Sequence, residues 1–487
     1  MHDAPLGTPE HPLRVAVIGA GPSGFYAAEH LQEAPDLHVQ VDMYDRLPTP
    51  FGLVRGGVAP DHQKIKSVTR VYDRIATHPE FRFYGNVELG RDLTHADLVA
   101  YYHAVIYAVG ARTDRRMGIP REHLPGSHSA TEFVGWYNAH PDFRSLSFDL
   151  SAEQAAVVGN GNVAMDLARI LASPPEALAG TDIAEHALEA LGASRIREIH
   201  VLGRRGPAQA AFTNKELREL GEIPGVDVVV RPQDLELDPL SQAYDRRHPN
   251  RTRERNLAIL AEFAARPPSG ARKRIVLHFL VSPLEILGTE RVESLTAVAN
   301  ELYESEDGSL RARPTGERQT LPVGLVFRAI GYQGVPLAGV PFDPMSAVIP
   351  NASGRIVDPA SGAPVAGEYV VGWIKRGPRG IIGTNKPDAQ ETVQALLEDL
   401  AAGRLAKDEV PGRHVLERLL SERRQDFVSY EDWQLIDLLE KERGAERGDR
   451  PRLKFSRVEE MLAALAERKR AVGLGEGGDG EDAAASG

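Results

Sequence analysis

The sequence predicts an α/β protein in which two similar units each begin with a strand, a glycine-rich turn and a helix. The first pattern is a β-branched run at 14–18, followed by Gly19-Ala20-Gly21-Pro22-Ser23-Gly24 and a helical stretch to about Leu31. The second is a run at 155–158, followed by Gly159-Asn160-Gly161-Asn162-Val163-Ala164. With 487 residues, 42% of them apolar, the chain exceeds the length at which one core usually keeps growing. We therefore expect two domains.

The first unit continues with a strand at 39–44 that ends in Asp45. A long glycine- and proline-containing segment at 48–60 follows, and such loops are usually functional. A helix is expected to begin near Asp61, and residues 104–109 read as a buried strand.

In the second unit the next strand is expected at 196–202, and a run at 323–330 resembles the strand at 104–109. The runs at 275–281 and 292–300 look like antiparallel additions. A buried strand at 369–371, followed by a glycine loop and a helix at about 388–400, indicates that the chain returns to its first domain. One domain is thus inserted in the other. The predicted boundaries are 1–111 and 332–470 for the first domain with a C-terminal helical extension, 112–331 for the inserted domain, and 471–487 for a disordered tail.

Composition excludes several classes of function. The formal net charge of -12 argues against nucleic-acid and membrane-surface partners, which need a positive field. The chain has no cysteine, so it has no disulfide, no thiolate metal site and no cysteine-bound iron-sulfur cluster of its own, and we expect no metal. Residues 1–13 lack the apolar core of a secretory signal and no apolar run reaches membrane-spanning length, so a cytoplasmic location is expected.

The first glycine turn has the spacing of a dinucleotide-binding fingerprint. Gly19, Gly21 and Gly24 allow backbone amides to approach a pyrophosphate at the positive end of a helix. Asp45 lies about 20 residues further on, where a carboxylate can accept hydrogen bonds from ribose hydroxyls. An ordinary tight turn is the alternative for the glycines alone, but the combination favours a nucleotide site.

The second turn, with Gly159, Gly161 and Ala164, is followed by a strand that ends in Gly203-Arg204-Arg205 instead of an acid. Guanidinium groups there can bind a 2′-phosphate, each charge-assisted bond contributing roughly 1.5–3 kcal/mol. The sequence therefore favours NADP over NAD.

Two nucleotide sites in one chain imply one resident redox group and one exchangeable substrate. We expect FAD at the first site and NADPH at the second. Flavin accepts a hydride and releases electrons singly, and the lack of cysteine removes any internal dithiol or iron-sulfur relay. Electrons should therefore pass from the flavin directly to an external acceptor.

The sequence resembles the adrenodoxin reductase-like ferredoxin–NADP reductases, especially their bacterial members, from about Arg14 to Leu400. This resemblance implies a glutathione reductase-like flavoprotein with two Rossmann-like domains. The segments that carry it are Leu47-Pro48-Thr49-Pro50-Phe51-Gly52-Leu53-Val54-Arg55, Gly57-Val58-Ala59-Pro60-Asp61-His62, 159–166, 203–207, Gly372-Trp373-Ile374-Lys375-Arg376-Gly377-Pro378 and 380–386.

The resemblance also implies site residues. Asp45 stands where the family often has glutamate, which changes the reach of the carboxylate but not its acceptors. The FAD contacts carried over are Ser23, Asp45, Leu53 and Leu89, with Trp373, Gly380, Ile381 and Ile382 near the isoalloxazine ring. The NADPH contacts carried over are Arg115, Asn160, Gly161, Asn162, Val163, Arg204, Arg205, Glu216 and Gly380.

His62 and Glu219 are the implied catalytic pair, a proton relay near the nicotinamide. For each residue alone, a packing or surface role is the alternative. The implied acceptor is a ferredoxin, an acidic iron-sulfur protein, and we expect it to dock on a locally basic surface. The candidates for that surface are Arg218, Arg246, Arg247, Arg251, Arg253, Arg255, Lys375 and Arg376.

Three functions are compatible with these observations: a ferredoxin–NADP reductase, an NADPH diaphorase that reduces quinones or another small acceptor, and an NADP-sensing flavoprotein without turnover. The resemblance favours the first. The sequence leaves the identity of the acceptor and the oligomeric state open.

Overall fold

The computed structural model describes residues 4–405, 407, 409–448, 450–471 and 473. The predicted disordered tail, 471–487, lies outside the described residues except for Ala471 and Gly473. The chain divides into two compact units, which are described separately. The first comprises Met1–Val54, Ser67–Gly110 and Pro336–Gly487, and the second Arg55–Lys66 and Ala111–Val335.

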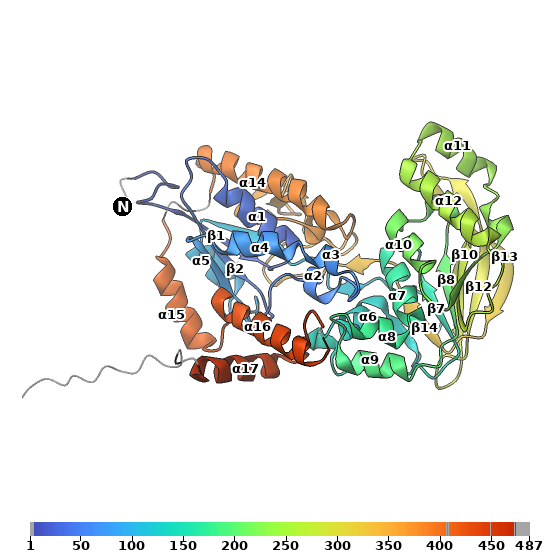
Figure 1. The fold of residues 1–487 in the computed structure, drawn as a ribbon. Helices are drawn as coiled ribbons and strands as arrows, with labels where there is room; N and C mark the ends of the chain where they lie inside the picture. Colours follow the sequence, from blue (N-terminus) through green and yellow to red (C-terminus); the bar gives the residue numbers. More distant parts are fainter. Residues whose placement is uncertain (1–3, 406, 408, 449, 472, 474–487) are drawn as a thin grey trace, which may run out of the picture. The chain divides into compact units, whose positions relative to one another are not determined.

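The sheet of the first unit has seven strands among the described residues (Figure 1). Four neighbouring strands, β4, β1, β2 and β3, pair in parallel, and β18 joins them in parallel next to β4. In spatial order the strands are β16 (Asn351–Ala352), β17 (Arg355–Val357), β18 (Pro364–Val370), β4 (Ala104–Tyr107), β1 (Leu13–Ile18), β2 (Val39–Tyr44) and β3 (Phe81–Tyr84). Strand β1, which lies between β4 and β2, is fully buried, as its continuous apolar pattern predicts.

Helices α1 and α14 lie side by side, so segments from both ends of the chain share one core (Figure 1). The C-terminal helices α15, α16 and α17 belong to the same unit, in agreement with the helical pattern of that segment. The helices are α1 (Pro22–Gln32), α2 (Leu53–Gly56, shared with the second unit), α4 (Thr69–Ala76), α5 (His95–Tyr101), α13 (Trp373–Arg376), α14 (Asn385–Ala401), α15 (Arg413–Arg423), α16 (Tyr430–Glu446) and α17 (Val458–Ala471).

The described part of the second unit contains a six-stranded parallel sheet and a three-stranded antiparallel sheet. The six strands, in order, are β6 (Ser127–Ser129), β14 (Leu325–Arg328), β7 (Gln154–Val158), β8 (Glu198–Gly203), β10 (Lys273–Phe279) and β9 (Val226–Val230). The other three are β11 (Val281–Leu287), β12 (Ser294–Glu304) and β13 (Leu310–Leu321). A short pair, β5 (Thr113–Asp114) with β15 (Tyr332–Gln333), joins the two ends of this unit.

The expectation of an antiparallel strand at 275–281 is wrong. Most of this run is β10, which pairs in parallel with β8 and β9. The long helix α12 (Arg251–Ala265) precedes it and provides the crossover that a parallel pairing requires. The expected antiparallel strand at 292–300 is confirmed as β12.

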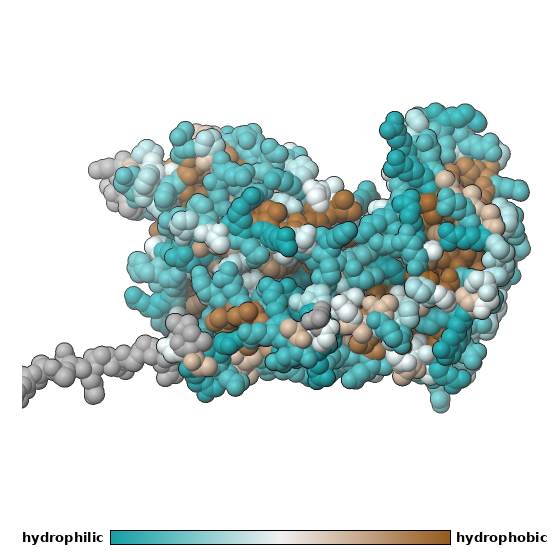
Figure 2. Space-filling view, in the orientation of Figure 1, coloured by the Kyte–Doolittle hydropathy of each residue, from teal (hydrophilic) through white to brown (hydrophobic). Residues whose placement is uncertain are grey.

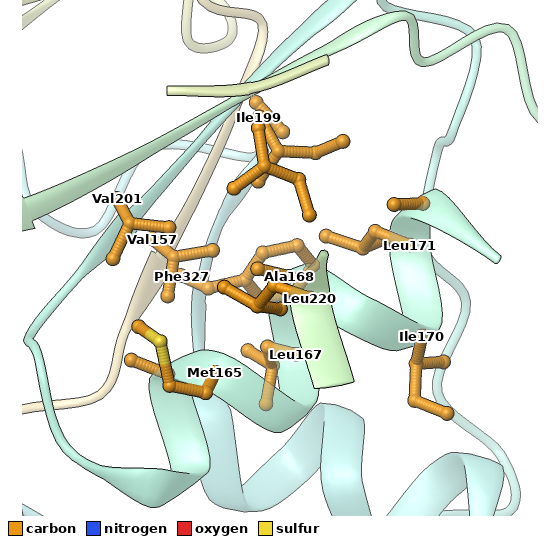
Figure 3. Close-up of a cluster of buried hydrophobic side chains, with 14 of the residues drawn as sticks. Val157, Met165, Leu167, Ala168, Ile170, Leu171, Ile199, Val201, Leu220 and Phe327 are labelled. Carbon is orange, nitrogen blue, oxygen red and sulfur yellow. The ribbon is translucent and has the colours of Figure 1, made fainter. Parts of the chain in front are cut away.

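Helix α7 (Asn162–Ala172) buries its apolar face against the parallel sheet. Figure 3 shows Met165, Leu167, Ala168 and Leu171 of α7 gathered with Val157, Ile199 and Phe327 from three strands. This packing fixes the start of α7, where the second glycine turn lies. The remaining helices are α3 (Gln63–Lys66), α6 (Ala130–Tyr137), α8 (Pro175–Ala179), α9 (Glu185–Gly192), α10 (Asn214–Leu220) and α11 (Pro239–Arg247).

Residues 55–66 group with the second unit, although the sequence prediction placed them in the first domain. Lys66 pairs with Asp182 at 2.6 Å and Asp61 pairs with Arg169 at 2.7 Å. These contacts to α7 and the α8–α9 region account for the difference. No helix in the described part of the chain is long and apolar enough to cross a membrane. The predicted cytoplasmic location stays a prediction.

Candidate functional site

The first glycine turn connects β1 to α1 and has the geometry of a phosphate cradle. Gly19 has a φ of +112°, and a Cβ there would lie 2.5 Å from the Ala108 carbonyl oxygen. A Cβ on Gly24 would lie 2.2 Å from the Gly19 carbonyl oxygen, so both positions require glycine. A Cβ on Gly21, by contrast, would meet no described atom within 4 Å. Since no side chain caps α1, its first amides face this open space.

Asp45 at the end of β2 ties the turn to the sheet. Its Oδ2 accepts a hydrogen bond from the Ala20 N–H at 3.0 Å, and its Oδ1 accepts one from the Leu47 N–H at 2.9 Å. A carboxylate has about four acceptor positions. Holding the turn and binding a ribose hydroxyl are therefore compatible roles for Asp45.

The loop before α14 meets the start of α1. Gly372 has a φ of +76°, and a Cβ on it would lie 2.5 Å from the Ser23 Oγ, so Ser23 and this loop are in close contact. Gly380 has a φ of +84°, and a Cβ on it would lie 2.3 Å from the Thr384 Oγ1. Trp373 and Ile382 are half-buried, whereas the Ile381 side chain is 64% exposed. The exposed apolar side chain of Ile381 is suited to contact a flat ligand.

Leu53 and Leu89 are also half-buried in the first unit. Leu53 begins α2, directly after the loop that lies on the glycine turn. Leu89 follows a segment that is hydrogen-bonded to Asp45, because the Val87 N–H donates to the Asp45 carbonyl oxygen at 2.9 Å. All predicted FAD residues thus lie in one unit, and Ser23 with Gly372 and Asp45 with Ala20 are joined by direct contacts.

The second glycine turn, between β7 and α7, repeats the geometry of the first. Gly159 has a φ of +135°, and a Cβ there would lie 2.2 Å from the Ala329 carbonyl oxygen. A Cβ on Gly161 would meet no described atom within 4 Å, and no side chain caps α7. Ala164 is fully buried, where Gly24 stands in the first turn.

Buried polar atoms without partners lie at this second turn. Among the described residues, Asn160 Nδ2 and Glu216 Oε2 are buried and have no hydrogen-bond partner. Asn162 Oδ1 accepts a hydrogen bond from the Thr213 N–H at 2.8 Å, which connects α7 to the segment before Glu216. An unsatisfied buried polar group costs about 1–3 kcal/mol. Two of them near an open turn indicate a ligand site, and the residues present fit a nucleotide.

Arg204 and Arg205 follow β8 and form no ion pair or side-chain hydrogen bond with the described residues. Arg204 is exposed and Arg205 is half-buried. Burial, and then the charge of Arg204, lower the pKa of Arg205. Their backbone is held firmly, since Asn300 Nδ2 donates to the Arg204 carbonyl at 2.9 Å and the Leu280 N–H donates to the Arg205 carbonyl at 3.0 Å. Two adjacent cations without a carboxylate are a suitable site for a phosphate.

The two remaining predicted NADPH contacts lie at the edges of this site. Val163 is half-buried in the first turn of α7. Arg115 is exposed, and its N–H donates to the Gly331 carbonyl oxygen at 3.0 Å, beside the β5–β15 pair. Gly380, predicted to contact both nucleotides, belongs to the first unit.

The structure brings His62 and Glu219 together. His62 Nε2 lies 2.7 Å from Glu219 Oε2, and His62 is 6% exposed. The pair borders a surface pocket of about 220 Å³ that is also lined by Glu222, Ser173 and Pro174.

A buried arginine that the sequence prediction missed organises this pair. Arg169 forms two hydrogen bonds with Asp61, at 2.7 and 2.9 Å, one with Asp166 at 2.7 Å, and lies 3.5 Å from Glu219. Although burial acts to raise the pKa of Asp61, Arg169 outweighs it and the pKa is lowered. For Asp166 burial prevails and raises the pKa. The i, i+3 spacing of Asp166 and Arg169, just after the glycine turn, was the available signal.

The basic surface proposed from the sequence needs correction. Lys375 is buried, with Nζ 2.6 Å from Glu391 and 3.3 Å from Asp388, so it cannot contribute to a docking surface. Arg253 pairs with Asp245 and Arg247 pairs with Glu304 at 3.1 Å. On the face shown in Figure 2, the surface over helices α11 and α12 is nevertheless mainly hydrophilic. Arg376 is half-buried and lies 3.5 Å from Asp388. Of the predicted candidates, those that are exposed and have no ion pair with the described residues are Arg218, Arg246, Arg251 and Arg255.

Comparison with known proteins places this geometry in a family. Residues 13–192 match the profile of the pyridine nucleotide-disulphide oxidoreductases. The chain is 48% identical over 464 residues to the NADPH-ferredoxin reductase FprA of Mycobacterium leprae, covering 93% of this chain and 98% of the relative. It is 43% identical over 465 residues to the mitochondrial NADPH:adrenodoxin oxidoreductase of Arabidopsis thaliana, covering 93% and 96%.

A solved structure of Mycobacterium tuberculosis FprA in complex with NADPH is similar to this chain, with a TM-score of 0.88 and 47% identity over 93% of this chain and 100% of the other. The predicted fold class, two dinucleotide-binding units of α/β architecture, is confirmed. The chain belongs to the adrenodoxin reductase-like ferredoxin–NADP reductases, the family that its sequence motifs predicted.

Proposed function

We propose that this protein is a ferredoxin–NADP reductase that takes hydride from NADPH and delivers single electrons to a ferredoxin-type iron-sulfur protein. The observation that carries the proposal is the pair of glycine turns with unlike side chains at the next strand end: Asp45 in the first unit, Arg204 and Arg205 in the second. Both units use the same backbone device, and their side chains distinguish the two nucleotides.

The first unit would hold FAD, which supplies the step from two-electron to one-electron transfer when bound. The open helix start at Gly21 would receive its pyrophosphate, Asp45 its ribose, and Leu53, Leu89 and Trp373 its apolar surfaces. The amides of the loop at Gly380, Ile381 and Ile382 would stabilise negative charge at the flavin edge.

The second unit would hold NADPH. Gly159, Gly161 and the start of α7 would receive the pyrophosphate, and Arg204 with Arg205 the 2′-phosphate. Asn160 and Glu216 have buried polar atoms that a ribose or amide group of the ligand would satisfy. NADH lacks the phosphate, so these two arginines would make the site selective.

His62 and Glu219 would hold and move a proton close to the nicotinamide. Their 2.7 Å contact permits direct transfer between Nε2 and Oε2, and the adjacent surface pocket gives the carboxylate access to solvent. Arg169 would keep Glu219 in position. Because hydride transfer needs mainly close stacking of the two rings, the pair would adjust the rate instead of creating it.

For the electron acceptor, the names of the relatives support a ferredoxin or adrenodoxin. A docking surface of Arg218, Arg246, Arg251 and Arg255 would attract an acidic partner despite the net charge of -12. Raising the salt concentration should therefore slow the association.

An anaerobic stopped-flow experiment tests the proposal. NADPH should bleach the yellow protein, and subsequent mixing with ferredoxins of the source cell should restore the colour while reducing a ferredoxin. Faster reoxidation by a small quinone than by every ferredoxin would make the protein a diaphorase. A colourless protein, or a yellow one that NADPH does not bleach, would refute the enzymatic proposal.

A further inference from the structure

The C-terminal extension contacts the two segments of the first unit that flank the predicted FAD site. Val428 forms an antiparallel bridge with Gly85, with N···O distances of 2.8 and 2.9 Å. Arg424 donates to the carbonyl and the side-chain oxygen of Asn86, at 3.0 and 2.7 Å. The Asn86 N–H in turn donates to the Leu47 carbonyl at 3.0 Å. The extension therefore supports the segment that leads to Leu89.

The second contact is aromatic. The Trp433 ring of α16 meets the edge of Phe51, with centroids 5.6 Å apart and an interplanar angle of 88°. Trp433 is 2% exposed and Phe51 is 5% exposed, so this contact lies in the core. Phe51 also packs against Phe25 and Tyr72, at 5.5 and 5.8 Å.

Phe51 has an unfavourable backbone conformation at the glycine turn. Its φ is +82°, a region that a residue with a bulky side chain occupies only where its surroundings enforce it. The Phe51 N–H donates to the Ala20 carbonyl at 2.7 Å, and a Cβ on the following Gly52 would lie 3.1 Å from the Gly21 Cα. The strained residue thus lies directly on the turn that would receive the pyrophosphate.

We infer that Trp433 is a positioning residue for FAD, which acts by holding Phe51, and with it the 48–54 segment, in the conformation that completes the first nucleotide site. The helical extension then has a role in cofactor retention in addition to covering the core. Without the indole, Phe51 would relax toward a favourable φ. The apparent FAD affinity would then fall in proportion to the fraction of molecules that keep the binding conformation. This inference rests on the proposed FAD site.

The test is the rate of flavin release from the holoenzyme after dilution, followed by the recovery of free-flavin fluorescence. We expect Trp433→Ala to raise the release rate about tenfold, the size of a 1.4 kcal/mol effect. Trp433→Phe, which keeps an aromatic ring, should stay within about threefold of the wild type. Met461→Ala removes a buried side chain from α17 of the same extension and serves as the matched control.

Unchanged release from Trp433→Ala would overturn the inference. So would equally fast release from Met461→Ala at the same loss of melting temperature, because the effect would then be general destabilisation. If Trp433→Ala does not fold, Trp433→Leu provides the same comparison. A double-mutant cycle with Phe51→Leu separates the two residues: in the Phe51→Leu background, the Trp433 substitution should have little further effect. A wild-type protein without FAD would refute the proposed function itself, which is a distinct outcome.

Discussion

At the scale of single residues, Arg204 and Arg205 should determine which nicotinamide nucleotide is used. Replacing both with alanine should weaken NADPH binding by roughly 10²–10⁴-fold, because two charge-assisted bonds of about 1.5–3 kcal/mol each are lost. NADH binding should change little. Titrations of the double variant with both nucleotides measure the difference, and Arg272→Ala, an exposed arginine of the same unit, is the control. An equal loss for both nucleotides would contradict the assignment.

His62 and Glu219 should affect the chemical step more than binding. In His62→Gln or Glu219→Gln the rate of flavin reduction should fall by about 100-fold, the low end of the effect of losing a proton-transfer group. The dissociation constant of NADPH should be nearly unchanged. Single-turnover kinetics separate the two quantities. Glu222→Gln changes another carboxylate of the same pocket and should leave the rate unaltered. A loss of NADPH binding without a loss of rate would assign the pair to binding.

At the scale of elements, each glycine turn contains a glycine that the fold requires and another that we expect the ligand to require. Gly21→Ala and Gly161→Ala add a methyl group where no described atom lies within 4 Å and φ is negative, so both variants should fold normally. They should nevertheless weaken FAD and NADPH respectively, because the methyl group enters the space of the pyrophosphate.

The matched variants Gly24→Ala and Gly159→Ala place a Cβ 2.2 Å from a backbone carbonyl oxygen and should lower the melting temperature markedly. Thermal unfolding and nucleotide titration of the four proteins make the comparison. Normal nucleotide binding by Gly21→Ala and Gly161→Ala would show that the ligands lie elsewhere.

The β8–β10 pair should make the second unit sensitive to acid. His200 on β8 and His278 on β10 lie side by side, with Nδ1 and Nε2 3.0 Å apart, and both are buried. Burial, followed by the nearby charge of His200 and Arg231, lowers the pKa of His278 to about 4. At pH values between the ordinary pKa of histidine and the lowered pKa of His278, this histidine is protonated in the unfolded chain but not in the folded protein. The stability of the fold therefore decreases as the pH falls through this range.

At pH 5 this deficit should reach about 2 kcal/mol relative to pH 7. Urea unfolding of the wild type and of His278→Leu at the two pH values measures it, and the variant should lose less stability on acidification. His123→Leu, which replaces an exposed histidine of the same unit, should behave like the wild type. An identical loss in all three proteins would assign the acid sensitivity to other groups.

At the scale of the whole molecule, each nucleotide should stabilise its own unit. A ligand present at 100 times its dissociation constant adds about 2.7 kcal/mol to the stability of the site that binds it. In differential scanning calorimetry, NADP⁺ should raise the transition of the second unit by roughly 5–10 °C, and FAD that of the first. Equal shifts of one common transition would mean that the units unfold as a single cooperative block.

Local sequence patterns predicted the two strand–turn–helix elements well, because a glycine fingerprint, its strand and its helix lie within a few residues of one another. The nucleotide contacts at these turns stay predictions. Features that depend on distant partners were not predictable. Lys375 lies beside Arg376 and Gly377, a context typical of a surface, and only the packing of α14 buries it against Asp388 and Glu391. Likewise, residues 55–66 join the second unit through Arg169 and Asp182, which are more than 100 positions further along the chain.

The position of β18 sets an order of events during synthesis. β18 completes the parallel sheet of the first unit beside β4, but the ribosome produces the whole of 111–335 between these two strands. At a synthesis rate of roughly 5–20 residues per second, one edge of β4 remains unpaired for on the order of ten seconds to a minute before β18 is made. The contiguous part of the second unit can fold during that interval. A nascent chain would therefore form the sheet of the second unit, with its proposed NADP site, before it completes the proposed FAD site. A chain stalled near residue 340 would expose an open sheet edge to chaperones and to aggregation.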